Sequence, residues 1–217
     1  MSLLIKICGV TTAEDAAMAA AAGADAIGVN LWPGSKRYVA PARAREVLAA
    51  VPSGVLKIGV FVDPPDAEEV TWQMQALRLD RAQLHGDERA ADFAMFDRAR
   101  LVRAVRVRDA ASFEAAAGWN PTLWLYDAFV DGFGGGGVPA PWPLIVGHAR
   151  RPFLLAGGLT PENVAAGIAA THPDGVDVAS GVEVRPGVKD AAKVAAFIAA
   201  ARAAARTAAH PANSSKP

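Results

Sequence analysis

The segment LLIKICGVTTAEDAAMAAAAG, residues 3–23, holds one complete strand, turn and helix start, and it sets the pattern for the rest of the chain. It opens with Leu3–Cys8, a nearly continuous aliphatic run of the kind found in parallel strands covered on both faces. Thr11 and Thr12 each stand three residues before an acidic residue, which is a start signal for a helix. An Ala-rich stretch follows and ends at Gly23, a common helix stop. The segment therefore predicts one βα unit.

The same alternation of aliphatic runs and Ala-rich stretches of helical length continues along the chain. Pro41 can occupy the first turn of a helix, and Thr160-Pro161-Glu162 opens another. Pro141 and Pro143 crowd the helix expected within residues 141–150, which we expect to be only a turn or two long. Eight strands are predicted: Leu3–Cys8, Ala26–Asn30, Leu56–Phe61, Arg81–Leu84, Leu101–Val105, Leu123–Asp127, Phe153–Ala156 and Val176–Val178.

Eight βα units in 217 residues predict a single-domain α/β protein, a (β/α)₈ TIM barrel. Alternating units also build open, doubly wound sheets, so that fold is the alternative. The first strand is followed by Cys8-Gly9-Val10-Thr11 instead of a dinucleotide-binding Gly-x-Gly-x-x-Gly turn. The missing turn counts against the open, doubly wound sheet. We expect the barrel to span residues 1–206. Residues 207–217, TAAHPANSSKP, lose all periodicity and are predicted to form a disordered C-terminal tail.

The balance of charge narrows the choice of partners. Lys and Arg together number 22, as do Asp and Glu, so no excess of positive charge favours nucleic acid or an anionic membrane surface. No stretch approaches the ~20 apolar residues that cross a bilayer, and the apolar run before Lys6 is too short for a signal peptide. We therefore expect a cytoplasmic protein with a small-molecule partner. The sequence leaves its oligomeric state open.

Reactive side chains gather at the predicted carboxyl ends of strands, where barrels carry their active sites. They are Cys8, Gln83, His85 and Asp127, with Asp177 inside the last strand. Each has an ordinary structural explanation, because a buried cysteine often acts as a small hydrophobe and a strand-end aspartate often caps a turn. Cys8 is the only cysteine, so neither an intrachain disulfide nor a multi-cysteine metal site is possible.

The alternation of side chains along a strand strengthens the case that Cys8 and Asp127 are catalytic residues. Asp127 shares a face with Leu123 and Leu125, and apolar neighbours disfavour a charged carboxylate, which suits a general acid. Lys6 and Cys8 also share a face, and the last strand of a barrel closes beside the first. We therefore expect a buried Lys6–Asp177 pair beneath the thiol, with the ammonium favouring the thiolate form of Cys8.

Four loops carry further candidates for substrate binding. Gly157-Gly158 and Ser180-Gly181 follow the seventh and eighth strands, where barrels recurrently hold phosphate on backbone N–H groups, although Gly-Gly alone also suits a tight turn. Arg37 can clamp a carboxylate or remain a solvated surface charge. Residues 131–137, DGFGGGG, read as a loop that folds over a ligand or as an ordinary linker.

Together these segments resemble phosphoribosylanthranilate isomerases, and the resemblance runs from about Lys6 to Phe197. No single motif is decisive, but their order over eight units is specific. The motifs are KICGVT at 6–11, GADAIG at 23–28, SKRYV at 35–39, GVFVD at 59–63, QLHGDE at 83–88, LAGGLTPENV at 155–164, GVDVASGVE at 175–183 and PGVKD at 186–190.

The resemblance implies an Amadori rearrangement in tryptophan biosynthesis, without metal or organic cofactor. It makes Asp127 the general acid and Cys8 the general base, and it places Arg37 at the anthranilate end of the substrate. His85 and Asp177 match substrate-site positions without an assigned role. The phosphate would be held by Gly157, Gly158, Ser180 and Gly181.

The chain departs from the family pattern in loops that touch neither Cys8 nor Asp127. Ser35-Lys36-Arg37 stands where Ser-Pro-Arg is usual, residues 134–137 are all glycine, and Ala179 replaces a common serine. Acceptance of a larger aminoimidazole substrate stays open. Two other functions remain as alternatives: another phosphate-binding barrel enzyme, such as a ribulose-phosphate epimerase or an indole-glycerol-phosphate synthase relative, and a non-catalytic barrel that binds a phosphorylated metabolite.

Overall fold

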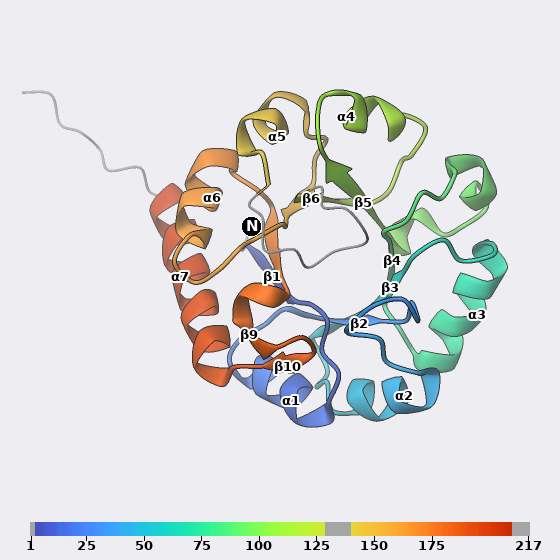
Figure 1. Ribbon diagram of the computed structural model, residues 1–217, viewed down its shortest axis with the longest axis horizontal. Coiled ribbons are helices and arrows are strands. Elements are labelled where there is room, and N and C mark those ends of the chain that lie inside the picture. Colours follow the sequence, from blue (N-terminus) through green and yellow to red (C-terminus); the bar gives the residue numbers. More distant parts are fainter. Residues whose placement is uncertain (1–2, 129–139, 210–217) are drawn as a thin grey trace, which may run out of the picture.

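The first strand lies hydrogen-bonded between the second and the last, which closes the sheet into a cylinder. The computed structural model describes residues 3–128 and 140–209. Within them, eight parallel strands follow one another around the barrel in chain order, as Figure 1 shows. The closed order confirms the predicted barrel and excludes the open sheet. The strands are β1 (Leu4–Ile7), β2 (Ala26–Asn30), β3 (Leu56–Phe61), β4 (Arg81–Leu84), β5 (Leu101–Val107), β6 (Leu123–Ala128), β7 (Phe153–Leu155) and β8 (Gly175–Val178).

A ring of helices surrounds the barrel (Figure 1). The α-helices are α1 (Ala13–Ala21), α2 (Pro41–Ala49), α3 (Ala67–Leu77), α4 (Ala111–Ala115), α5 (Trp142–His148), α6 (Val164–Thr171) and α7 (Ala191–Ala209). The Thr12 side chain accepts a hydrogen bond from the N–H of Asp15, and Pro41 opens α2, so both predicted start signals are confirmed. The helix expected within residues 141–150 is short, as predicted. Thr160-Pro161-Glu162 forms a turn, and α6 begins after it at Val164.

Two regions differ from a regular βα repeat. The connection between β4 and β5 contains only the 3₁₀ turns η1 (Ala90–Phe93) and η2 (Arg98–Arg100) where a helix was expected. Asp97 caps η2 by accepting a hydrogen bond from the Ala99 N–H, and this cap divides the segment into two short turns. After β8 the chain forms η3 (Ser180–Val182) and a hairpin of β9 (Glu183–Arg185) and β10 (Val188–Lys189), which the periodicity did not predict.

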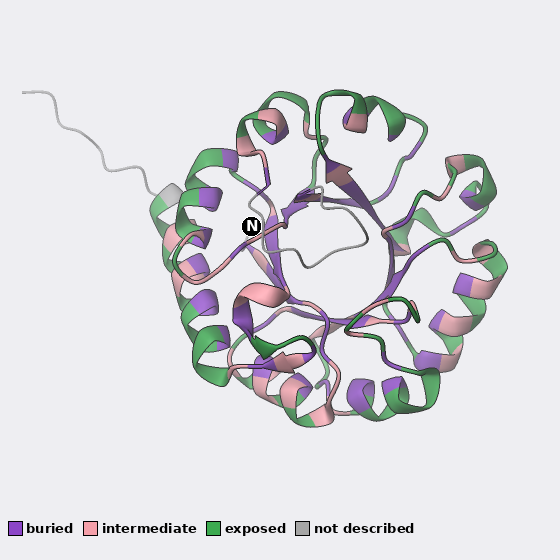
Figure 2. Cartoon of the chain, viewed as in Figure 1, coloured by how far each residue is buried: buried purple, intermediate pink, exposed green. Residues whose placement is uncertain are grey.

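Burial follows the two-layer plan of the barrel. Figure 2 shows mostly buried strands and helices that are exposed on their outer faces. Leu123 and Leu125 of β6 belong to a small apolar cluster with β5 and β7, on the strand face that also carries Asp127. This cluster forms an apolar floor below the barrel mouth.

The ends of the described segments bear on three expectations. Helix α7 continues through Ala209, so the first three residues of the predicted tail are helical, and residues 210–217 lie outside the described residues. The glycine-rich segment 131–137 also lies outside them. In residues 3–128 and 140–209, no helix is long and apolar enough to cross a membrane.

Candidate active site

A cavity at the carboxyl ends of the strands brings together the predicted catalytic pair and the three predicted substrate-binding residues. Cys8 after β1, His85 after β4, Asp127 from β6 and Asp177 from β8 all line it, and Arg37 reaches it from the loop after β2. These positions lie up to 169 residues apart in sequence and meet only because the barrel closes. The cavity therefore places a thiol and a carboxyl group around one space. The predicted phosphate-binding residues Gly157, Gly158, Ser180 and Gly181 are not among the residues that line it.

Cys8 lies above a buried ion pair, as the sequence predicted. Lys6 and Asp177 face each other across the β1–β8 seam, and the Lys6 Nζ lies 2.8 Å from the Asp177 Oδ1. Lys6 is fully buried. Burial alone would lower the pKa of Lys6, but attraction to Asp177 and to Cys8 outweighs it and raises the pKa, so this lysine stays charged.

The Lys6 ammonium lowers the pKa of Cys8 as expected, but the net shift of that pKa has the opposite sign. Desolvation at the barrel mouth, followed by repulsion from the Asp177 carboxylate, raises the pKa of Cys8, and the opposing attraction of Lys6 is smaller. The sequence argument considered the ammonium and left out both burial and the second charge. In the free site Cys8 therefore favours the neutral thiol.

The carboxyl group of Asp127 lies beside an imidazole. The Asp127 Oδ2 is 3.3 Å from the Nε2 of His85, and the Nδ1 of the same ring is 2.9 Å from the Nε2 of Gln83. Gln83 and His85 are two residues apart at the end of β4, so they share a face and reach the cavity together. Strand parity predicted the apolar floor under Asp127, whereas the contact with His85 spans the barrel mouth from the end of β4 to β6, two strands that β5 separates.

Arg37 is already engaged by an acidic residue. Its Nε and Nη2 donate to both carboxylate oxygens of Glu183, at 2.8 and 2.6 Å. The Glu183 Oε1 also accepts a hydrogen bond from the Nζ of Lys189 at 2.9 Å, and that Nζ reaches the carbonyl oxygen of Ala179 at 3.1 Å. Glu183 thus ties the loop after β2 to the hairpin after β8.

The charges of this cluster follow from its burial and pairing. Burial raises the pKa of Glu183, but hydrogen bonding to Arg37 and attraction to Lys189 outweigh burial and leave it below its usual value. Burial lowers the pKa of Lys189, although Glu183 opposes the shift. The hydrogen bond to Glu183 raises the pKa of Arg37. Sequence reasoning missed Glu183 and Lys189, although both lie in quoted motifs and Glu183 directly follows the buried Val182.

The two glycine-containing loops pack directly on one another. A Cβ placed on Gly181 would lie 1.9 Å from the carbonyl oxygen of Leu159, so only glycine permits this contact. Gly157 has a φ of +82°, and a Cβ there would lie 2.4 Å from the backbone nitrogen of Ala128. The backbone N–H groups of Gly158 and Gly181 donate to no acceptor within the described parts of the chain. The loops after β7 and β8, which include Ser180, therefore leave backbone N–H donors beside the part of the cavity that Asp127 lines.

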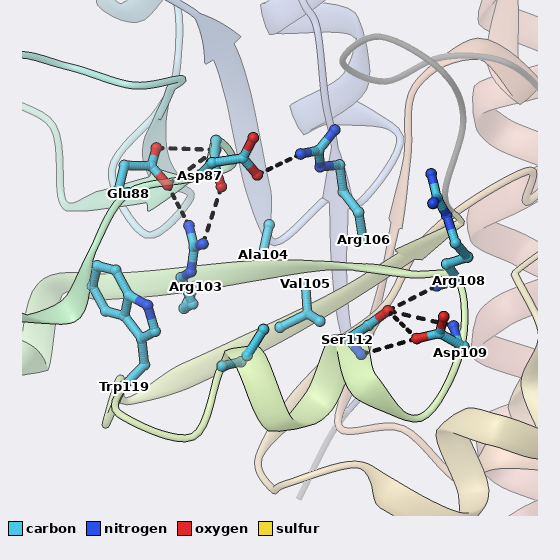
Figure 3. Close-up of a pocket in the computed structure, with 13 residues that line it drawn as sticks. Asp87, Glu88, Arg103, Ala104, Val105, Arg106, Arg108, Asp109, Ser112 and Trp119 are labelled. Carbon is cyan, nitrogen blue, oxygen red and sulfur yellow. Dashed lines mark hydrogen bonds and ion pairs between the residues drawn. The ribbon is translucent and has the colours of Figure 1, made fainter.

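A second cavity, of about 450 Å³, lies between β5 and α4. Figure 3 shows that its charged side chains point toward one another: Arg103 toward Glu88, and Arg106 toward Asp87. Arg103 also donates to the carbonyl oxygen of Gly86. These pairs connect β5 to the loop after β4. The first cavity, which holds the thiol and Asp127, is therefore the candidate active site.

Comparison with known proteins gives one consistent result. The model of the family described as N-(5'-phosphoribosyl)anthranilate (PRA) isomerase matches residues 5–200. The N-(5'-phosphoribosyl)anthranilate isomerase of Dechloromonas aromatica (strain RCB) is 45% identical over 195 residues, which cover 89% of this chain and 93% of that protein. That of Geotalea uraniireducens (strain Rf4) is 42% identical over 191 residues, covering 87% and 93%.

Solved structures agree. The phosphoribosyl anthranilate isomerase of Thermotoga maritima superimposes with a TM-score of 0.86 at 35% identity, covering 93% of this chain and 99% of that chain. A second structure of such an isomerase, in complex with reduced 1-(o-carboxyphenylamino)-1-deoxyribulose 5-phosphate, gives a TM-score of 0.82 at 35% identity with the same coverage.

Proposed function

This chain belongs to the N-(5'-phosphoribosyl)anthranilate isomerase family, and on that premise we propose that Asp127 and Cys8 are the general acid and the general base of its reaction. The chain is an aldose–ketose isomerase of tryptophan biosynthesis. It converts N-(5-phosphoribosyl)anthranilate to 1-(2-carboxyphenylamino)-1-deoxyribulose 5-phosphate by an Amadori rearrangement. The observation that carries the assignment of roles is the single cavity lined by one thiol and by the Asp127 carboxyl group.

The reaction begins with the carboxyl group. Protonated Asp127 gives its proton to the ring oxygen of the ribose, the bond from C1 to that oxygen breaks, and the ring opens to an iminium ion. The position of Asp127 supports this role, because it shares a strand face with Leu123 and Leu125 and its side chain lines the cavity. The Nε2 of His85 lies 3.3 Å from the Asp127 Oδ2 and can donate a hydrogen bond to the carboxylate that results.

The thiol acts second. The thiol of Cys8 first loses its proton to solvent. The resulting thiolate removes the proton from C2, and the electron pair of that C–H bond neutralises the iminium to give an enolamine, which tautomerises to the ketone. Burial keeps the pKa of Cys8 high in the free site. The cationic iminium then provides a nearby positive charge that favours the thiolate at the moment when it is needed. Each such proton transfer contributes typically about 10²- to 10⁴-fold in rate.

The remaining contacts position the substrate. Backbone N–H groups of Gly157, Gly158, Ser180 and Gly181 would hold the phosphate, supported by the free donors at Gly158 and Gly181. Arg37 faces the anthranilate carboxylate with the nitrogen that Glu183 leaves available, Nη1. Asp177 acts through Lys6 beneath the thiol. We also propose a cytoplasmic location, because a thiol that works as a base must stay reduced.

The test follows the loss of phosphoribosylanthranilate fluorescence with purified protein. We expect turnover by the wild type and losses of at least about 10²-fold for Cys8→Ser and Asp127→Asn. Glu68→Gln, on the exposed surface of α3, is the control and should retain full activity. Inert wild-type protein would contradict the function, and wild-type rates in both site variants would contradict the assigned roles.

A further inference from the structure

Gln83 is a buried amide in the active-site cavity that the reaction described above does not use. Its exposed fraction is only 1%, and it lies two residues before His85 on the same strand face. Its Nε2 is 2.9 Å from the Nδ1 of His85. Its Oε1 has no hydrogen-bond partner among the described residues. The position of this side chain therefore depends on its single contact with the imidazole.

That contact determines which ring nitrogen carries the proton. An amide NH₂ group can only donate, so the Nδ1 that it faces must accept. The proton of the neutral ring then lies on Nε2, the nitrogen 3.3 Å from the Asp127 Oδ2.

We propose that Gln83 is a positioning residue that holds His85 as the neutral tautomer protonated on Nε2, the nitrogen 3.3 Å from the Asp127 Oδ2. Among the described residues this Nε2 makes no hydrogen bond in the free site. The proposal rests on the proposed role of Asp127 as the general acid. An imidazolium would need a proton on Nδ1 as well, and that proton would point at the amide donor of Gln83. Gln83 therefore opposes the charged ring.

A neutral ring suits both stages of acid catalysis. Before ring opening, Asp127 must carry a proton, and a full positive charge at 3.3 Å would favour its ionised form instead. After Asp127 has given its proton to the ring oxygen, the Nε2–H of His85 stabilises the new carboxylate by a hydrogen bond. The ring keeps its own proton throughout, so the proton count of the reaction is unchanged.

The backbone around His85 is held independently of Gln83. Arg103 donates to the carbonyl oxygens of Leu84 and Gly86, at 3.2 and 3.0 Å. Glu88 accepts from the N–H of Gly86 at 3.0 Å and pairs with Arg103, as Figure 3 shows. The peptides on both sides of the histidine are thus fixed. Replacing Gln83 should therefore change the proton arrangement of the ring more than its position.

Other charged groups surround the ring and contribute to its charge state. Asp127 alone among them lies within ion-pair distance of the imidazole in the described residues. The remaining groups that line the cavity or hold the adjacent loop are Cys8, Arg37 and Asp177 across the cavity, and Asp63, Asp87, Glu88, Arg103 and Arg106 behind the loop. The hydrogen-bond contact of Nδ1 is with Gln83, so this contact is the one to change.

The experiment measures the tautomer directly. Imidazole ¹⁵N NMR of the wild type at neutral pH should show His85 with an unprotonated Nδ1 and a protonated Nε2, with a His85→Gln variant used for assignment. Gln83→Glu exchanges the donor for an acceptor and should produce a protonated Nδ1. Gln75→Glu makes the same change on the exposed surface of α3 and should leave the His85 signals unchanged.

The activity of the same proteins completes the test. We expect Gln83→Glu to lower kcat by roughly 10- to 100-fold, the usual cost of losing a partner that orients a site histidine, with a smaller change in KM. A wild-type ring protonated on Nδ1, or a Gln83→Glu variant with an unchanged tautomer or an unchanged kcat, would overturn the proposal. The NMR result does not depend on turnover, so inert wild-type protein would reject the proposed function alone.

Discussion

Cys8 sits where burial and the Asp177 charge both work against the thiolate that the reaction needs. Because its pKa in the free site is raised, the thiolate fraction at neutral pH is small and grows as the pH increases. We therefore expect iodoacetamide to alkylate Cys8, the only cysteine, in the free enzyme at a rate that rises with pH through the neutral range and into the alkaline range. The pH dependence of that alkylation rate checks this, and a rate that is already constant from neutral pH upward would contradict it.

The single carboxylate of Glu183 contributes to the stability of the fold. The pKa of Glu183 in the folded state lies below its value in the unfolded state. Its contribution to the free energy of unfolding is therefore complete above the unfolded pKa, near 4.3, and is lost as the pH falls through the folded pKa. Glu183→Gln leaves Arg37 and Lys189 without their shared counter-charge and should cost about 3–5 kcal/mol at pH 7.

Urea unfolding between pH 7 and pH 3 measures both effects of this substitution. The wild type should lose stability toward acid, and the difference between wild type and Glu183→Gln should shrink over the same range. Glu114→Gln, on the exposed side of α4, provides the control and should follow the wild-type curve. A constant difference at every pH would show that the carboxylate charge is not the cause.

The glycine-containing loops after β7 and β8 pack directly on one another. Gly181→Ala would drive a methyl group into the carbonyl oxygen of Leu159, so the loop after β8 must move away from the loop after β7. We expect weaker inhibition by inorganic phosphate and a KM raised by about tenfold or more, equivalent to about 1.4 kcal/mol of binding. Gly147→Ala in α5, where a Cβ meets nothing within 4 Å, should leave both unchanged. Equal phosphate inhibition in the two variants would remove the loop contact from the phosphate site.

The elements also show how far sequence reasoning reaches. Strands β2 and β3 were predicted to the residue because a buried parallel strand is a short, mostly aliphatic run with clear ends. The Lys6–Asp177 pair followed from parity and closure alone. The β9–β10 hairpin and the partners of Arg37 did not follow, because they depend on how irregular loops fold against one another and not on a repeating period. The sign of the Cys8 shift failed for a related reason, since burial depth is a property of the assembled site.

At the scale of the whole molecule, the Lys6–Asp177 pair spans the seam that closes the barrel. Lys6→Met leaves a buried carboxylate without its partner and should destabilise the fold by about 3–5 kcal/mol. Lys6→Met combined with Asp177→Leu removes both charges and should recover much of that loss. Urea unfolding of the two single variants and the double variant gives the coupling energy. Additive losses would mean that the pair does not couple β1 to β8.

Closure of the barrel also constrains when the protein can become active in the cell. The Lys6 and Asp177 partners are separated by 171 positions, and Arg202 of α7 further anchors the first strand through the carbonyl oxygen of Leu3. At a synthesis speed of ~5–20 residues per second, roughly 10 to 30 seconds pass on the ribosome between these two residues. Throughout that interval Lys6 of the nascent chain lacks its ion-pair partner and the Cys8 thiol lacks its cavity. One edge of β1 also remains free to pair with a wrong strand. Chaperones that bind such exposed strand edges would therefore bind this protein during translation, before the barrel closes and the active site forms.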